Sequence, residues 1–196
     1  MKDFFDSLRV YAKENWIPIL EEETEVFLSE LLLEIKPKSI LEIGTCIGYS
    51  SMVFSTILND NVEIDTIERN PKMVKIAKTN YEKLGKKNIN IIEKDAIKVL
   101  SSITKRYDFI FIDANKTKYP FYYEHAMRLI NNGGYIVGDN IGFDGMVLSG
   151  EYPAHKHRTA VRALRKFVKL VKEDFRLSTF VYEIGDGFTV SKVNFN

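Results

Sequence analysis

Residues 40–50 read Ile-Leu-Glu-Ile-Gly-Thr-Cys-Ile-Gly-Tyr-Ser, an apolar strand that runs into a glycine turn and the start of a helix. Gly44 allows the backbone to approach a ligand closely, because glycine has no side chain to block it. Ser50 lies at the mouth of the following helix, where backbone N–H groups and the helix dipole favour an anionic group such as a carboxylate. The stretch therefore predicts a turn that binds a nucleotide-like cofactor.

On either side of this stretch, short β-rich runs alternate with longer amphipathic segments, which is the pattern of βαβ units. The runs are almost entirely apolar, so we expect helices on both faces of a mostly parallel, doubly wound α/β sheet of seven strands. The last two runs flank the Gly-rich turn 183–187 and predict an antiparallel hairpin at the edge of that sheet. The expected strands are 39–43, 63–67, 89–93, 107–112, 135–138, 177–182 and 188–193, and the expected helices include 4–15, 24–35 and 72–84.

The composition excludes several classes of protein. With 196 residues, 45% of them hydrophobic, the chain is sized for one core, so we expect a single domain over residues 1–196. The 28 Lys and Arg residues nearly balance the 27 Asp and Glu residues, so overall charge does not predict nucleic-acid or membrane binding. The apolar runs are too short to cross a bilayer, and the first residues do not resemble a signal peptide. A lone cysteine, Cys46, excludes an internal disulfide, and we expect a cytoplasmic protein.

Acidic residues end the next two strands. Glu68 ends the second strand, where an acidic side chain can bind both hydroxyls of a ribose, and Asp95 and Ala96 end the third, where an adenine ring would lie. The alternative is that the glycines only shape a turn, that Glu68 is a solvated strand end and that Asp95 caps a helix. Suitable chemistry at three successive strand ends favours the cofactor site. The G-x-x-x-G spacing differs from the G-x-G-x-x-G of dinucleotide-binding folds, which disfavours a pyrophosphate ligand.

The fourth and fifth strands end in oxygen-rich sequences. Asp113 follows the fourth strand, and Asp139 and Asn140 follow the fifth. Because ligands of an open α/β sheet collect at the carboxyl ends of the strands, we expect these side chains to face the same crevice as Gly44. Two carboxylates and an amide oxygen suit Mg²⁺, and Mn²⁺ suits the same ligands. The structural alternatives are a helix cap at Asp113 and a turn at 139–140.

Lys116 follows Asp113 by three residues and is a candidate general base. A neighbouring cation and partial burial would both lower the pKa of its amine, which would bring the neutral form within reach of the working pH. By itself, Lys116 would be interpreted as an ordinary surface lysine.

In order, the motifs L-E-I-G-T-C-I-G-Y-S, I-E-R-N, F-I-D-A-N-K and G-D-N resemble those of the metal-dependent O-methyltransferases of the catechol and caffeoyl-CoA type. The resemblance covers the chain from about Asn15 to its end. It implies a Rossmann-like class I methyltransferase fold, S-adenosylmethionine as the cofactor, and a homodimer that involves the N-terminal helices. The residues it implies are Leu20, Glu42, Gly44, Ser50, Glu68, Asp95, Ala96 and Asp113 for the cofactor, Asp113, Asp139 and Asn140 for Mg²⁺, and Lys116 as the base.

Within that family, the chain looks most like the bacterial enzymes that methylate 5-hydroxyuridine at the wobble position of tRNA. Residues 11–14 and 17–19, the stretch 141–147 and the turn 185–187 carry this closer likeness. Asn115 stands where the catechol enzymes place one tryptophan that flanks the substrate, whereas Trp16 matches their other flanking tryptophan. The missing wall leaves room for a substrate larger than a free catechol.

The nucleoside has suitable chemistry, because 5-hydroxyuridine carries a hydroxyl beside a carbonyl and can chelate one Mg²⁺ much as a catechol does. The metal would acidify the hydroxyl, Lys116 would take its proton, and the oxygen would attack the sulfonium methyl in line. The basic residues of 155–172 form a local positive face that suits tRNA phosphates. The same pattern is also typical of an ordinary amphipathic helix, so both interpretations stay open.

Three other functions compete with this one. The same chemistry could act on a small diol or phenolic metabolite. A nicotinamide-dependent oxidoreductase is disfavoured by the loop spacing and by the lack of an evident Tyr-x-x-x-Lys pair. A non-catalytic cofactor-binding module is disfavoured while Lys116 accompanies an intact set of metal ligands.

Overall fold

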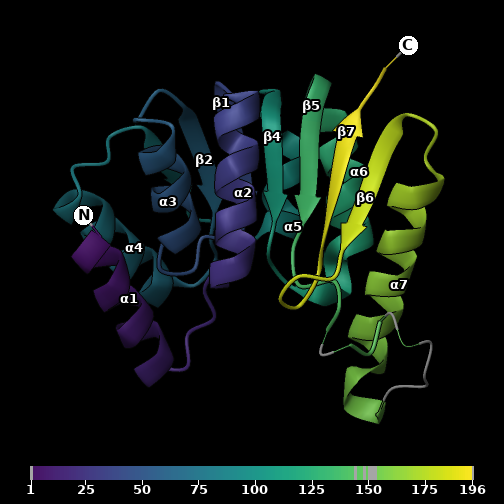
Figure 1. Ribbon diagram of the computed structural model, residues 1–196, viewed down its shortest axis with the longest axis horizontal. Helices are drawn as coiled ribbons and strands as arrows, with labels where there is room; N and C mark the ends of the chain where they lie inside the picture. The colour runs from purple at the N-terminus through teal and green to yellow at the C-terminus, as the bar shows by residue number, and fades with distance from the viewer. Residues whose placement is uncertain (1, 144, 148, 150–153, 196) are drawn as a thin grey trace.

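The computed structural model describes residues 2–143, 145–147, 149 and 154–195. Its strands form a seven-stranded sheet in the order β3-β2-β1-β4-β5-β7-β6 (Figure 1). Strands β1 to β5 pair in parallel, and β7 is antiparallel to both β5 and β6, which confirms the predicted fold. The strands are β1 (Ser39–Ile43), β2 (Glu63–Ile67), β3 (Ile89–Ile92), β4 (Tyr107–Ile112), β5 (Ile130–Gly138), β6 (Leu177–Tyr182) and β7 (Phe188–Val193).

The helices fill the connections between strands. The α-helices are α1 (Lys2–Glu14), α2 (Glu22–Ile35), α3 (Tyr49–Ile57), α4 (Pro71–Lys83), α5 (Ala96–Val99), α6 (Tyr119–Leu129) and α7 (Arg158–Glu173). Short 3-10 helices in the described residues are η1 (Leu100–Ser102), η2 (Lys116–Lys118) and η3 (His155–His157). In the described part of the chain, no helix has both the length and the apolar character that a membrane span requires.

The strand that differs most from its prediction is β5. It begins at Ile130 instead of Tyr135, because Ile130 pairs with Tyr107 of β4 before a shift in register. The intervening Asn-Asn-Gly-Gly has the composition of a turn, and the sequence pattern therefore predicted a later start. Strand β3 ends one residue earlier than predicted, and the other five strands have the predicted bounds.

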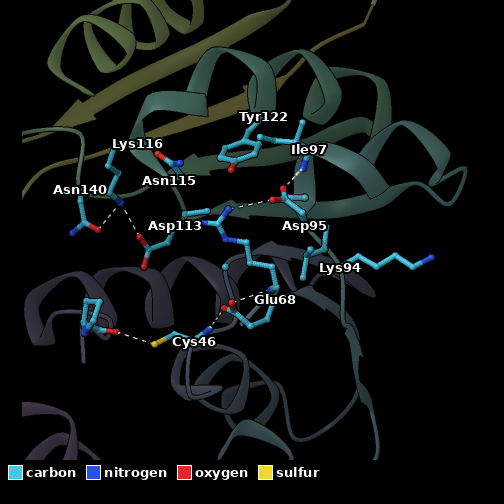
Figure 2. Close-up of a pocket in the computed structure, with 16 residues that line it drawn as sticks. Cys46, Glu68, Lys94, Asp95, Ile97, Asp113, Asn115, Lys116, Tyr122 and Asn140 are labelled. Atoms are coloured by element: carbon cyan, nitrogen blue, oxygen red, sulfur yellow. Dashed lines mark hydrogen bonds and ion pairs between the residues drawn. The ribbon is translucent and has the colours of Figure 1, made fainter. Parts of the chain in front are cut away.

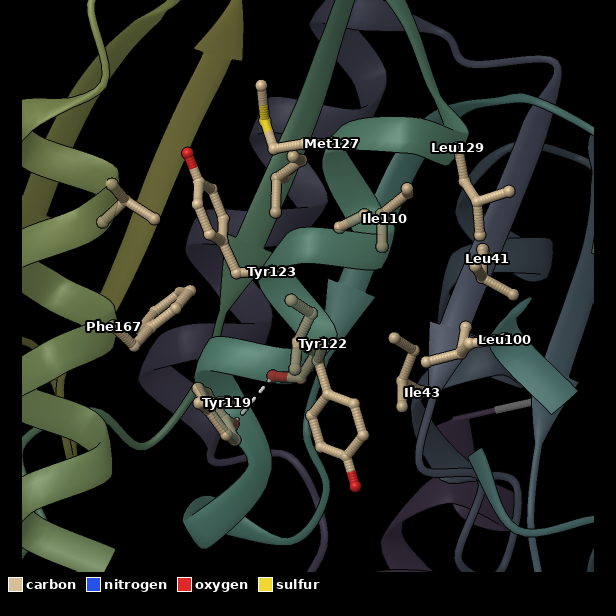
Figure 3. Close-up of a cluster of buried hydrophobic side chains, with 14 of the residues drawn as sticks. Leu41, Ile43, Leu100, Ile110, Tyr119, Tyr122, Tyr123, Met127, Leu129 and Phe167 are labelled. Carbon is tan, nitrogen blue, oxygen red and sulfur yellow. Dashed lines mark hydrogen bonds between the residues drawn. The ribbon is translucent and has the colours of Figure 1, made fainter. Parts of the chain in front are cut away.

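Two hydrophobic cores lie on opposite faces of the sheet. Along β4, Phe109 and Phe111 belong to the core under α1–α4, whereas Ile110 and Ile112 belong to the core under α5–α7. Figure 3 shows the second core, where side chains of β4 and α6 meet Phe167 of α7. Each such fully buried side chain contributes about 1.5–3 kcal/mol to folding. The two cores fix the strands against both helical layers and so fix the strand ends.

The order of the strands reverses between β1 and β4. From β1 the chain passes to β2 and β3 on one side and then returns to β4 on the other side. At the carboxyl ends of these strands, Ile43 of β1 pairs with Ile112 of β4, and Ile112 pairs with Gly138 of β5. The residues that follow these three strands therefore lie side by side at one edge of the sheet, where ligands of this architecture bind.

Candidate active site

A cavity of about 320 Å³ opens at the order reversal between β1 and β4 (Figure 2). The predicted site residues that line it are Gly44, Glu68, Asp95, Ala96, Asp113, Lys116 and Asn140. Other lining residues include Pro18, Cys46, Arg69, Lys94 and Tyr122, to which the sequence analysis gave no role at a site. The structure thus brings together residues that are almost a hundred positions apart in the chain.

Gly44 is required by two features of the backbone. Its φ is +112°, and a Cβ atom at this position would lie 1.9 Å from the carbonyl oxygen of Asp113. The Gly44 N–H donates to the carbonyl of Ile67 at 3.1 Å, which ties the turn to the end of β2. Because Asp113 contributes backbone atoms here, no rotamer change could make room for a side chain. Gly44 allows the ends of β1 and β4 to approach this closely.

Glu68 joins the glycine turn to the loop after β2. Its Oε2 accepts the Cys46 N–H at 2.9 Å, and its Oε1 accepts the N–H groups of Arg69 at 2.9 Å and Asn70 at 2.8 Å. Three backbone donors therefore fix the orientation of this carboxylate in the cavity wall (Figure 2).

Asp95 is both a helix cap and a cavity-lining residue, the two interpretations that the sequence left open. Its Oδ1 caps α5 by accepting the Ile97 N–H at 2.9 Å, and the residue also lines the cavity. Its Oδ2 lies 3.2 Å from the guanidinium of Arg69. The hydrogen bond from Ile97 and the Arg69 cation hold the pKa of Asp95 below its usual value. Arg69 could be found only from the structure, because the pair joins two loops.

The structure does not place Glu42, Ser50 and Leu20 on the cavity wall. Glu42 is fully buried beneath the turn, where Ser50 Oγ and Thr66 Oγ1 donate to its carboxylate. Burial raises the pKa of Glu42 to about 7, despite these two hydrogen bonds. Leu20 is 3% exposed, and its carbonyl accepts from Arg9 at 3.1 Å. The predicted cofactor contacts of these residues stay predictions.

Lys116 lies among the predicted metal ligands. Its Nζ donates to Asp113 Oδ1 at 2.8 Å and to Asn140 Oδ1 at 2.8 Å, and it lies 3.4 Å from the carbonyl of Asp139 (Figure 2). Oxygen atoms from the ends of β4 and β5 therefore converge on one positive charge at the cavity wall. Asp113 and Asn140 contribute side-chain oxygens to this arrangement, whereas Asp139 contributes only its backbone carbonyl and does not line the cavity. The predicted metal site stays a prediction.

The pKa of Lys116 departs from the prediction. Burial lowers it, but the contacts with Tyr119 and Asp113 outweigh burial and raise it above the ordinary value for lysine. The expectation of a lowered pKa is therefore wrong for this arrangement, because the sequence did not reveal that the amine itself pairs with a predicted ligand.

Asp139 is 3% exposed, and its Oδ1 accepts the N–H of Asn140 at 2.8 Å. Burial and the nearby Asp113 carboxylate raise the pKa of Asp139 to about 7. Asn140 has a φ of +51°, which turns the chain sharply after β5. Among the described residues, no group of three or more His, Cys, Asp and Glu is placed to hold a metal; the predicted set has two carboxylates and one amide.

Tyr119 contacts Lys116 and the ends of β4 and β5. The sequence did not predict this role. Its hydroxyl accepts from Lys116 at 3.1 Å and lies 2.9 Å from the carbonyl of Ile112 and 2.7 Å from that of Asp139. It therefore links the last residues of β4 and β5. The sequence shows a tyrosine three residues after Lys116, but this spacing is equally typical of a core residue.

Asn115 caps η2, because its Oδ1 accepts the Thr117 N–H at 3.1 Å. The helix-cap interpretation of Asp113 is therefore wrong, since Asn115 takes that role. Asn115 also lines the cavity. Trp16 is 92% exposed and lies two residues before Pro18, a cavity-lining residue.

The β6–β7 turn holds the segment that follows Asn140. Ile141 donates to the carbonyl of Gly187 at 2.9 Å, and Gly142 donates to that of Asp186 at 2.6 Å. Glu21 accepts the N–H of Asp186 at 3.1 Å. The turn 185–187 therefore positions the loop after β5. Asp144, within the stretch 141–147 that carried the closer likeness, lies outside the described residues.

Comparison with known proteins agrees with this geometry. The family model described as O-methyltransferase matches residues 4–193. The chain is 31% identical over 185 residues to the tapetum-specific methyltransferase 1 of Arabidopsis thaliana, covering 91% of this chain and 78% of the plant protein. It is 30% identical over 175 residues to the caffeoyl-CoA O-methyltransferase of Populus kitakamiensis, covering 85% and 74%.

A solved structure gives the same result. The O-methyltransferase of Bacillus cereus in complex with S-adenosylhomocysteine (SAH) superposes with a TM-score of 0.85 at 28% identity, covering 98% of this chain and 91% of the other. The matching family model and the two plant relatives extend over most of the chain. The chain therefore belongs to the S-adenosylmethionine-dependent O-methyltransferase family of the caffeoyl-CoA and catechol type.

Proposed function

We propose that this O-methyltransferase uses a divalent cation, Mg²⁺ or Mn²⁺, to methylate 5-hydroxyuridine at the wobble position of tRNA. The observation that carries the proposal is the convergence of Asp113 and Asn140 on the Lys116 ammonium, beside the Gly44 turn. Candidate oxygen ligands and the amine of Lys116 are thus next to the cavity in which a methyl donor would lie.

For the cofactor, we assign the cavity wall from Gly44 to Ala96. Glu68 would accept the ribose hydroxyls, since its carboxylate is already oriented by three backbone N–H groups. Asp95 and Ala96 would flank the adenine, and Asp113 would contact the cofactor from the opposite wall. SAH in the Bacillus cereus relative supports S-adenosylmethionine as the cofactor of this cavity.

The residues present fit a divalent cation. The nearby Asp113 carboxylate disfavours ionisation of the buried Asp139, and a bound cation relieves such repulsion. Asp113, Asp139 and Asn140 would hold it through oxygen atoms, as Mg²⁺ and Mn²⁺ prefer. A cation bound there would supply the charge that acidifies the acceptor hydroxyl.

Lys116 would take the proton of that hydroxyl at Nζ. The contact with Asp113 is one cause of the raised pKa of Lys116, so binding of Asp113 to a cation would remove one of the contacts that oppose the effect of burial. Tyr119 would keep Nζ at the ends of β4 and β5. The deprotonated oxygen would then attack the sulfonium methyl, with SAH as the leaving group.

The choice of tRNA as the methyl acceptor depends on Asn115 in the cavity wall. This side chain is engaged with Thr117, and the flanking tryptophan of the catechol enzymes is missing at this position, which suits a substrate attached to a macromolecule. The two adjacent oxygens of 5-hydroxyuridine suit a shared cation.

The test is methylation of tRNA isolated from a strain that lacks this gene and retains 5-hydroxyuridine. Purified enzyme with S-adenosylmethionine and Mg²⁺ is expected to convert 5-hydroxyuridine to 5-methoxyuridine, as measured by nucleoside mass spectrometry, and a chelator is expected to stop the reaction. Methylation of a catechol or phenol with none of tRNA would support the second candidate, a small-molecule O-methyltransferase. The name of the Populus kitakamiensis relative, caffeoyl-CoA O-methyltransferase, favours that second candidate.

We also propose that the enzyme is a homodimer that uses its N-terminal helices. Val10 of α1 and Val26 and Leu33 of α2 are each more than half exposed, which leaves apolar surface on both helices. Light scattering is expected to give twice the chain mass, and a monomer at micromolar concentration would contradict this.

A further inference from the structure

A strongly basic segment lies outside the cavity, on η3 and α7. Residues 155–172 include seven Lys and Arg residues and no Asp or Glu, so the rest of the chain has 21 Lys and Arg against 27 Asp and Glu. The net charge of +1 therefore combines a positive segment with an acidic remainder. A polyanion would be attracted to this segment.

The charges of α7 form a line on its solvent face. Arg162, Lys166 and Lys169 are exposed at spacings of four and three, so they share one face, and Lys172 extends the line to about 15 Å. No ion pair within the described residues involves Arg162, Lys166 or Lys172. Lys169 is 3.9 Å from Glu173, with both side chains mostly exposed, and such a pair is weak. The opposite face is buried through Val161, Leu164, Phe167 and Val171.

A groove of about 660 Å³ lies between α6 and α7, beside this line. It is lined by apolar side chains that include Phe121, Met127 and Leu170. Its charged lining residues are three basic ones, Arg128, Lys166 and Arg176, and one acidic one, Glu124. Figure 3 shows Tyr123 of α6 between the two helices, close to Phe167. Lys166 belongs both to the groove and to the charged line, so the two features form one surface.

An exposed aromatic ring stands at the end of this surface. Phe175 is 92% exposed, although both of its neighbours are held in place. Asp174 accepts from Tyr123 at 2.5 Å and pairs with Arg176 at 2.6 Å. Its neighbour Arg176 is already paired with Asp174, so the ring itself is what this turn offers to a ligand. An exposed ring on an anchored turn is a platform on which an unpaired base can stack.

We infer that the α7 line, the α6–α7 groove and Phe175 form a docking surface for RNA. The cations would meet successive phosphates, and Phe175 would stack on a base. The amino end of α7 lies at the same edge of the sheet as the carboxyl ends of β4 and β5, so RNA along α7 would extend from the cavity (Figure 1). The inference rests on the proposed function, because tRNA is the RNA that the cavity would modify.

The first test changes the charge of the line. The variant Arg162→Glu/Lys166→Glu/Lys169→Glu is expected to bind tRNA at least about tenfold more weakly in fluorescence anisotropy, with a reduced dependence on salt. Its KM for tRNA should rise while kcat at saturating tRNA and the affinity for SAH stay within about twofold of wild type, since the cavity is untouched. The matched control is Lys75→Glu/Lys83→Glu/Lys87→Glu, an equal charge change at exposed sites on or near α4, which should bind tRNA like wild type.

The second test separates RNA from other polyanions. Phe175→Ala keeps the charge and is expected to weaken tRNA binding about fivefold or more, with no change in the affinity for heparin, which has no bases. Wild-type tRNA affinity in the triple variant, or equal losses in the triple variant and the control, would overturn the inference. If tRNA binds through this surface but is not methylated, the proposed function fails and the docking surface stands.

Discussion

At the scale of single residues, Lys116 is the side chain on which the proposed chemistry depends. Its Nζ contacts Asp113, Asn140 and Tyr119. Among the described residues of the cavity wall, no other basic group lies as close to these oxygens. Lys116→Ala is expected to lower kcat by about 10²- to 10⁴-fold, the usual contribution of a general base. Methyl transfer from labelled S-adenosylmethionine measures it.

Lys118→Ala is the matched control, because Lys118 is exposed on the same 3-10 helix and does not line the cavity. It should retain wild-type kcat. Full activity in Lys116→Ala, with SAH bound normally, would remove Lys116 from the reaction.

Glu42 gives a prediction about stability and pH. Its native pKa of about 7 lies above the ordinary 4.5, so the protonated form stabilises the fold; this contribution is complete below pH 4.5 and is lost as the pH rises through 7. Glu42→Gln does not titrate. The free energy of unfolding of the variant, relative to wild type, should therefore rise by about 3 kcal/mol between pH 4.5 and pH 8 in urea titrations. A difference that does not vary with pH would contradict a buried, titrating Glu42.

Site residues could be predicted from the sequence when they directly follow a strand. Gly44, Asp113 and Asn140 were predicted because they follow strand ends, and strand ends were evident from the apolar runs. Glu42 was harder, because the sequence does not tell whether a polar residue inside a strand faces a ligand or a buried pair of hydroxyls. Tyr119 and Arg69 depend on partners from other loops, which local patterns do not reveal.

At the scale of elements, the close approach of β1 and β4 depends on the glycine between β1 and α3. Gly44→Ala would bring Cβ to 1.9 Å from the Asp113 carbonyl at a φ of +112°. We expect a loss of about 2–5 kcal/mol in the free energy of unfolding, together with loss of SAH binding, measured by denaturation and calorimetry.

Gly85→Ala is the control for this change. Gly85 also has a positive φ, +65°, but no atom lies within 4 Å of a Cβ built there, so only backbone strain of about 1 kcal/mol is expected. Equal effects of the two substitutions would show that strain, and not the contact with β4, makes Gly44 necessary.

The bounds of strands were predicted well where the strand is apolar throughout. Buried parallel strands are apolar throughout, and Gly, Pro or Asp mark their ends, so β1, β2 and β4 had the predicted bounds. The start of β5 was missed because Ile130 pairs with Tyr107 of β4 ahead of a register shift. The residues between Ile130 and Tyr135 have the composition of a turn.

At the scale of the whole molecule, the alternation of strands and helices predicted the sheet, and the strand order then determined where the site lies. The order of the strands reverses between the parallel neighbours β1 and β4, and the cavity opens there. The charge asymmetry also belongs to this scale. The sequence revealed the basic segment 155–172, but only the packing of α6 against α7 places it beside an apolar groove.

The claim on which the whole account depends is that oxygen atoms from the ends of β4 and β5 hold one divalent cation beside the methyl donor. The most direct measurement is a crystal structure with SAH and Mn²⁺, with the metal located by anomalous scattering. The account predicts one strong peak coordinated by Asp113, Asp139 and Asn140, with SAH over Gly44 and along Glu68. Bound SAH without a peak at these three residues, or with their oxygen atoms directed away from one another, would contradict it.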